Sequence, residues 1–200
     1  FSKKMGKKNK LFYGVEYVQN EVYSTGINTD ISTGLITDAP ARYPRATWKS
    51  YGAYLTNHYT ISDKFVLQGG LRYSLFDLAA KYDTTFYAFN FTEGQINNGA
   101  LTGSIGLNFH PNKSLAIATN LSTGFRSPNV DDMGKVFDSE PGAVVVPNNN
   151  LESEYVYNAD LSVTKLFGEQ IKLNVTGFYT VLENALVRRD FNLNGEDSIM

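Results

Sequence analysis

The chain has 200 residues, of which 19% are charged and 14% aromatic, and its formal net charge is −2. It has no cysteine, which excludes a disulfide framework, a thiolate metal site and a cysteine nucleophile. The near-neutral charge provides no basic face for nucleic acid, and the aromatic content does not fit a disordered chain.

Apolar and polar residues alternate along most of the chain, which indicates β-strands, and no apolar run approaches the roughly 20 residues of a membrane-spanning helix. All six prolines are predicted to fall between strands, because proline cannot donate to a strand ladder. Seven strands are predicted, spanning about 10–25, 46–61, 64–80, 99–110, 113–126, 153–167 and 170–183.

Short and long connections alternate between these strands. Tight turns are predicted at 62–64, 110–113 and 167–170, with a fourth at 7–9, and long loops near 26–45, 81–98 and 127–152. An up-and-down meander built in this way has tight turns at one end and long loops at the other.

The odd-numbered residues of the strands form an apolar face, on which Leu71, Leu107 and Leu161 are typical, and the even-numbered residues form a polar face. Aromatic side chains gather near both ends of the apolar face and form two girdles, with Phe65 beside a tight turn and Tyr73 and Phe125 towards the long loops. A soluble antiparallel sandwich would bury the apolar face, whereas a membrane barrel would turn it to lipid. The aromatic girdles, the unequal connections and the Ser/Thr/Asn-rich polar face favour an all-β, antiparallel, up-and-down transmembrane β-barrel.

Three segments carry a resemblance to a known family. Gly124-Phe125-Arg126-Ser127-Pro128-Asn129 closes one predicted strand, Asn150-Leu151-Glu152-Ser153-Glu154 opens the next, and NVTGFYTVLENALVRRDF occupies 174–191. In these segments the chain resembles the barrel of TonB-dependent outer-membrane receptors. The match is good over about 120–191, and over 10–110 only the hairpin rhythm agrees; Ser153 stands where the family often has proline.

The resemblance implies a barrel of about 22 strands closed by an N-terminal plug domain, of which this chain is a partial segment of about 7–8 strands. All of 1–200 is then barrel wall, and the plug domain and the C-terminal strands are expected to lie outside it. The resemblance also implies a multi-pass place in the outer membrane of a Gram-negative bacterium, in contact with outer-membrane lipid.

The implied function is uptake of a scarce nutrient with energy that TonB delivers through the plug domain. Ferric siderophore or haem is the first expectation for the cargo, with cobalamin and oligosaccharide left open, and a surface lipoprotein is a candidate partner. Two other classes remain as alternatives: a passive porin or structural barrel, and a soluble all-β binding module. No nucleic-acid partner, cofactor, metal site or enzymatic activity is expected.

Two groups of polar side chains are candidates for function. The first lies in the long loops and is a candidate for cargo binding at the extracellular mouth or for contacts that order the loop, against the simpler interpretation of a solvated loop with Arg126 tied to a carboxylate. It comprises Arg126, Asp131, Asp132, Lys135, Arg188 and Arg189. The second faces the lumen and is a candidate for plug contact, against the interpretation that it only solvates the interior; it comprises Glu16, Gln68, Arg72, Glu154, Asn158, Asp160 and Lys172.

Overall fold

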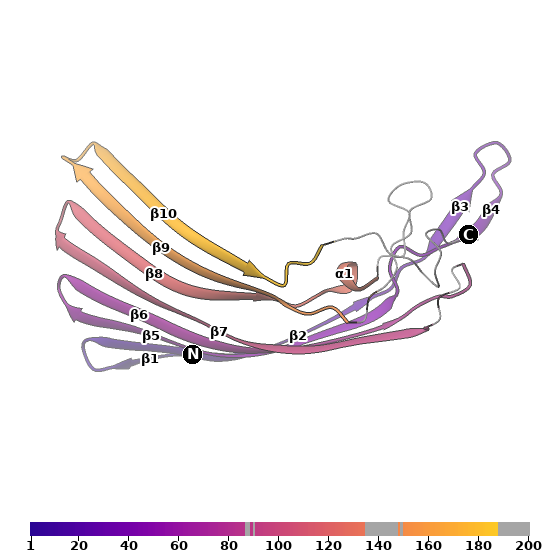
Figure 1. Ribbon diagram of the computed structural model, residues 1–200, viewed down its shortest axis with the longest axis horizontal. Coiled ribbons are helices and arrows are strands. Elements are labelled where there is room, and N and C mark those ends of the chain that lie inside the picture. Colours follow the sequence, from indigo (N-terminus) through magenta and orange to yellow (C-terminus); the bar gives the residue numbers. More distant parts are fainter. Residues whose placement is uncertain (87–88, 90, 135–147, 149, 188–200) are drawn as a thin grey trace.

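The computed structural model describes residues 1–86, 89, 91–134, 148 and 150–187. Eight strands form one antiparallel sheet, and each pairs with the next along the chain apart from an inserted two-stranded hairpin, β3 (Gly26–Thr29) and β4 (Ile36–Ala39). The sheet is a curved strip with its tight turns at one end and its loops at the other (Figure 1). Its strands are β1 (Ser2–Met5), β2 (Asn9–Val22), β5 (Arg45–Ser62), β6 (Phe65–Lys81), β7 (Glu93–Asn112), β8 (Leu115–Arg126), β9 (Glu154–Phe167) and β10 (Ile171–Glu183).

The predicted meander with four tight turns is confirmed, with one correction. Pro111 lies inside β7 and not between strands, at a register shift between Phe109 and Asn112. A bulge is one of the few places in a sheet where the missing N–H of proline is tolerated. The turn between β7 and β8 therefore falls about two residues later than the sequence predicted.

The long loops carry more structure than was predicted. β7 begins at Glu93 and not near 99, because it stays paired with β6 as far as Lys81, where Lys81 Nζ lies 3.3 Å from Glu93 Oε1. The β3–β4 hairpin occupies part of the predicted loop 26–45. Its turn is closed by Asp30, whose Oδ1 accepts the amides of Ser32 and Thr33 at 2.7 and 3.0 Å. These two amide hydrogen bonds lower the pKa of the Asp30 carboxyl.

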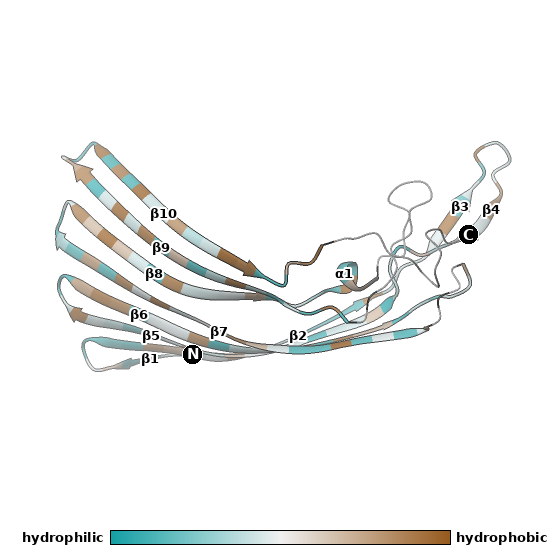
Figure 2. Cartoon of the chain, in the orientation of Figure 1, coloured by the Kyte–Doolittle hydropathy of each residue, from teal (hydrophilic) through white to brown (hydrophobic). Residues whose placement is uncertain are grey.

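The odd-numbered apolar face is exposed, as the barrel interpretation requires. Leu71 and Leu161 are 59% and 53% exposed, so they do not pack into a dry protein centre. Figure 2 shows apolar and polar residues alternating along the strands. The large side chains that the eight-stranded sheet leaves exposed keep the odd parity that the sequence predicted, apart from Val18, Tyr54, Leu166 and some on β10.

The polar even-numbered face gives way to an apolar one towards the loops, and here the sequence analysis was wrong. Ala46, Leu78, Ala80 and Ile96 are buried, and all four are even-numbered. They form a cluster with Met133 of the short helix α1 (Val130–Gly134), which lies on the inner side of the curved sheet (Figure 1). The loops fold back over the inner face, and they need an apolar surface on which to pack.

The aromatic girdle has one exception. The Phe125 ring lies 5.4 Å from Phe76, which itself packs 5.6 Å from Trp48 beside the buried cluster. Phe125 was predicted to belong to the outward-facing girdle, but it reaches a ring on the even-numbered face. The cause is a divergence of β7 and β8 near Thr123, where their ladder ends at the Ser104–Ser122 pair.

Candidate functional site

Arg126, the last residue of β8, joins three segments at the loop end of the sheet. Its Nη2 donates to both carboxylate oxygens of Asp132 on α1, at 2.8 and 2.7 Å, and its Nη1 donates to Oε2 of Glu154 at 2.8 Å. The other oxygen of Glu154 accepts the backbone N–H of Leu186 at 2.8 Å. One guanidinium thereby fastens α1, the start of β9 and the segment after β10 to the end of β8.

The local sequence presents Asp132 to this arginine. Asn129 caps the short helix, with its Oδ1 accepting the amides of Asp131 and Asp132 at 2.8 and 3.1 Å. In return, Asp132 Oδ2 accepts the backbone N–H of Asn129 at 3.0 Å. Met133, which is fully buried, anchors the same turn against the inner face. The helix is held by its cap, by its apolar anchor and by the ion pair together.

The structure brings together only some of the loop residues that the sequence predicted to bind cargo. Arg126 and Asp132 pair directly, and Glu154, which the sequence assigned to the lumen group, completes the cluster. Asp131 lies beside Asp132 on α1. Lys135, Arg188 and Arg189 lie outside the described residues. Sequence reasoning recognised that Arg126 would meet a carboxylate but did not identify either partner.

A second ion pair crosses the inner face of the sheet. Arg72 Nη2 on β6 lies 2.7 Å from Glu16 Oε1 on β2, with β5 between them, and Arg72 Nε donates to Ser74 Oγ at 3.0 Å. Gly52 of β5 makes this reach feasible, because a Cβ at that position would collide with the Arg72 guanidinium. Gly52 is paired with Glu16 on one side and Ser74 on the other.

Amide and carboxylate groups form a further network over β8, β9 and β10. Asp160 Oδ2 accepts Asn120 Nδ2 at 3.3 Å and Asn158 Nδ2 at 3.1 Å, and the Thr180 hydroxyl donates to Asn158 Oδ1 at 2.7 Å. Sequence reasoning placed Asn158 and Asp160 in the lumen group and did not select Asn120 or Thr180. Their shared even parity, combined with the strand register, was the signal that could have found them.

The remaining lumen candidates stand apart from both networks. Gln68 Nε2 lies 3.1 Å from His58 Nδ1 across the β5–β6 pair, and Lys172 is exposed on β10 near its turn. Among the described residues, no cluster of three or more histidine or carboxylate groups is placed to hold a metal ion. The inner face thus offers an array of hydrogen-bond donors and acceptors, suited to binding a polar surface.

Comparisons with known proteins agree with this geometry. A sequence model of the family described as "TonB dependent receptor-like, beta-barrel" matches residues 1–197. Three solved structures share the fold. The "Copper transporter OprC" is 20% identical with a TM-score of 0.72, and the match covers 89% of this chain and 27% of that one. The FrpB iron transporter from Neisseria meningitidis in its F3-3 variant is 18% identical with a TM-score of 0.64, covering 92% of this chain and 27% of that one. A double mutant of the Serratia marcescens hemophore receptor HasR, in complex with its hemophore HasA and heme, is 16% identical with a TM-score of 0.69, covering 88% of this chain and 30% of that one. The chain spans less than a third of each of these proteins, which are transporters or receptors and not enzymes.

Proposed function

Because this chain belongs to the TonB-dependent receptor β-barrel family, we propose that it forms part of the wall of an outer-membrane receptor that takes up a scarce nutrient. The observation that carries the proposal is the two-sided sheet. Aliphatic and aromatic side chains stand exposed on one face, while the other face holds the Arg72–Glu16 pair and the Asn120–Asp160–Asn158 network. Such a wall suits lipid outside and a polar lumen inside.

The proposed role of the inner face is to bind a plug domain contributed from outside residues 1–200. Plug contact is the role we propose for Glu16, Gln68, Arg72, Asn158, Asp160 and Lys172, and Glu154 instead belongs with Arg126 at the mouth. Charges and amides on a wall of this kind hold a polar partner by many hydrogen bonds that exchange readily with water. That suits a plug that must move when TonB supplies energy.

Ferric siderophore or haem is the proposed cargo. The names of the FrpB iron transporter and of HasR, a hemophore receptor solved with heme, support iron or haem, and the name of the copper transporter OprC adds copper to the panel to be tested. We propose that the Arg126 cluster orders the mouth for this cargo, with Asp131, Lys135, Arg188 and Arg189 as further candidates for contact.

The test is uptake by cells that express the full-length receptor as their only route for the nutrient. Cells would be offered radiolabelled ferric siderophores, haem, cobalamin and copper in turn, with and without TonB. The expected result is uptake of an iron compound or haem that stops when TonB is depleted. Uptake that continues unchanged without TonB would instead support the passive porin alternative.

A further inference from the structure

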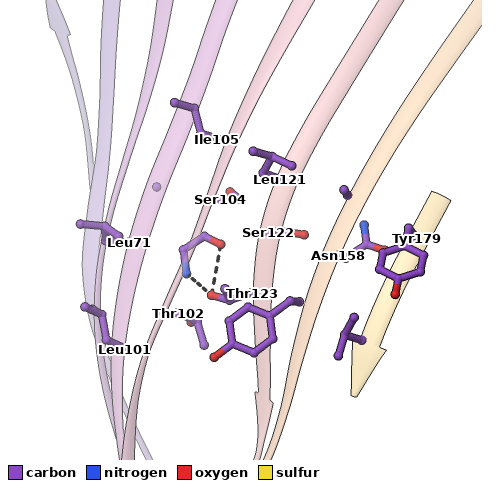
Figure 3. A pocket seen from close by; sticks show the side chains of 15 residues that line it. Leu71, Leu101, Thr102, Ser104, Ile105, Leu121, Ser122, Thr123, Asn158 and Tyr179 are labelled. Atoms are coloured by element: carbon purple, nitrogen blue, oxygen red, sulfur yellow. Dashed lines mark hydrogen bonds between the residues drawn. The ribbon is translucent and has the colours of Figure 1, made fainter. Parts of the chain in front are cut away.

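The ladder between β7 and β8 stops about halfway along β7 and about two-thirds of the way along β8. It ends at the Ser104–Ser122 pair, although β7 stays paired with β6 as far as Glu93 and β8 stays paired with β9 as far as Arg126. Just beyond this point the Thr123 side chain replaces the backbone hydrogen bonds that would continue the ladder. Its hydroxyl accepts the Gly103 N–H at 2.9 Å and donates to the Gly103 carbonyl at 3.4 Å (Figure 3).

A groove of about 640 Å³ lies over this divergence. Its lining comes from five strands and is mainly apolar, although the even-numbered Thr102, Ser104, Ser122 and Asn158 also border it (Figure 3). Its large side chains are odd-numbered and exposed, which places them on the apolar face. Gly103 and Ala159 are the smallest odd-numbered residues that line it, and the Leu71 side chain packs over Gly103. The side chains that form its walls are Leu71, Leu101, Ile105, Leu121, Tyr157 and Tyr179.

Strand register explains the shape of the groove. Ala159 lies between Leu121 on β8 and Tyr179 on β10, so a small residue is flanked by two large ones. Thr123 stands opposite Tyr157 in the neighbouring row. On the loop side, the Tyr155 hydroxyl crosses the divergence to donate to the Leu101 carbonyl at 3.2 Å. Side-chain hydroxyls thus satisfy backbone N–H and C=O groups of β7 where the β7–β8 ladder is missing.

We propose that this groove seats one acyl chain of an outer-membrane lipid at a fixed position, an inference that rests on the membrane placement in the proposed function. The groove is continuous with the exposed apolar face, which that function turns towards lipid, and its walls offer methyl, methylene and ring surfaces. Backbone polar groups in a hydrocarbon layer must be satisfied within the protein and kept from water. A seated acyl chain shields the Thr123–Gly103 hydrogen bonds and fills the space that the diverging strands leave.

The first experiment places a compact aliphatic diazirine amino acid at Ala159 of the full-length receptor in the outer membrane, because a bulky aromatic crosslinker would fill the groove as Ala159→Phe does. Val175 serves as the matched position, because it is exposed on the same face of β10 but does not line the groove. After extraction and thorough detergent washing, the sample is irradiated and its adducts are identified by mass spectrometry. The expected result is a lipid adduct at Ala159 about tenfold more abundant than at Val175, the ratio of a site bound about 1.4 kcal/mol more tightly.

Equal adducts at both positions would mean ordinary boundary lipid only, and would overturn the inference. A protein adduct at Ala159 would overturn it as well, because a partner chain would then cover the groove. Ala159→Phe fills the groove and is expected to remove the retained lipid, whereas Val175→Phe is expected to leave it in place. Lipid retention by Ala159→Phe at the wild-type level would also count against the site.

The uptake assay separates this inference from the proposed function. Neither phenylalanine variant alters the inner face, so both are expected to transport nutrient at the wild-type rate. If the wild-type receptor retains lipid at Ala159 but shows no TonB-dependent uptake, the function fails and the lipid site stands. If uptake depends on TonB and lipid is equal at the two positions, only the lipid site fails.

Discussion

Arg72 on β6 and Glu16 on β2 meet across the intervening strand β5, with 2.7 Å between Nη2 and Oε1. Such a pair can form only if the strand between them carries no obstructing side chain, and Gly52 meets that requirement. The pair therefore depends on three strands at once, and it fixes the direction in which the arginine points over the lumen.

Gly52→Ala is expected to separate this ion pair, because the new methyl group displaces the guanidinium. Both partners are at least partly exposed, so the loss in unfolding free energy should be only about 0.2–1 kcal/mol. The measurement is urea unfolding of the full-length receptor in lipid vesicles, as a double-mutant cycle with Glu16→Gln. Gly177→Ala is the control, since a Cβ there meets nothing within 4 Å. Fully additive losses in the cycle would show that Gly52 acts independently of the pair.

Arg126→Ala is expected to release α1 and the start of β9, because it leaves the carboxylates of Asp132 and Glu154 without their cation. Both carboxylates are mostly buried, and losing hydrogen bonds to such charged groups costs about 1.5–3 kcal/mol. Hydrogen–deuterium exchange should rise in Val130–Gly134 and around Leu186, with the central strands unchanged. Lys172→Ala, which removes an exposed cation on β10, is expected to leave both segments as in the wild type. Unchanged exchange in Arg126→Ala would show that the helix cap and Met133 hold α1 unaided.

Tyr82 combines deep burial with an unpaired hydroxyl. It is 6% exposed, and within the described part of the chain its hydroxyl has no hydrogen-bond partner. Burial raises the pKa of this phenol to about 12. In the unfolded chain a tyrosine ionises near pH 10, so unfolding releases a proton between about pH 10 and 12 and stability falls across that window.

Tyr82→Phe is therefore expected to be neutral or stabilising at pH 8, and to lose less stability than the wild type between pH 10 and 12. Thermal unfolding of the full-length receptor at pH 8 and pH 11 provides the measurement. Tyr23→Phe is the matched control, because Tyr23 is exposed in a neighbouring loop and its removal should leave the pH dependence as it was. A clear loss of stability in Tyr82→Phe at pH 8 would reveal that the hydroxyl has a partner after all.

The sequence predicts features that depend on the local alternation of apolar and polar residues. It cannot predict contacts that form only where distant loops fold back onto the sheet. Leu71 and Leu161 face outward because a period of two fixes their side relative to their neighbours. The bulge at Pro111 and the divergence after Ser104–Ser122 alter register and parity locally, so Phe125 could not be placed from its number alone. The apolar inner surface around Leu78 was missed because its burial depends on loops that fold back onto the sheet.

The candidate sites likewise contain residues that strand parity predicts and partners that only the folded loops determine. The polar parity of the strands identified Glu16, Arg72, Asn158 and Asp160 as sharing one face, and the structure joins each of them to a neighbour on that face. Neither partner of Arg126 could be chosen from sequence. Asp132 is one of several carboxylates within one long predicted loop, and Glu154 opens the next predicted strand, where its even number assigned it to the lumen group. The Asn129 cap decides which aspartate turns towards the guanidinium.

A charge placed on neighbouring residues of β9 tests the orientation of the whole sheet. Leu161 lies mid-strand on the exposed apolar face, and Ser162 lies on the polar one, so their side chains differ in surroundings but not in depth. Leu161→Arg should cost about 2–4 kcal/mol of unfolding free energy in vesicles, as expected for a cation at the middle of the bilayer. Ser162→Arg, which meets a polar lumen, should cost clearly less. Equal costs, or the reverse order, would mean that the odd-numbered face does not lie in hydrocarbon, and the transport proposal would then lose its physical basis.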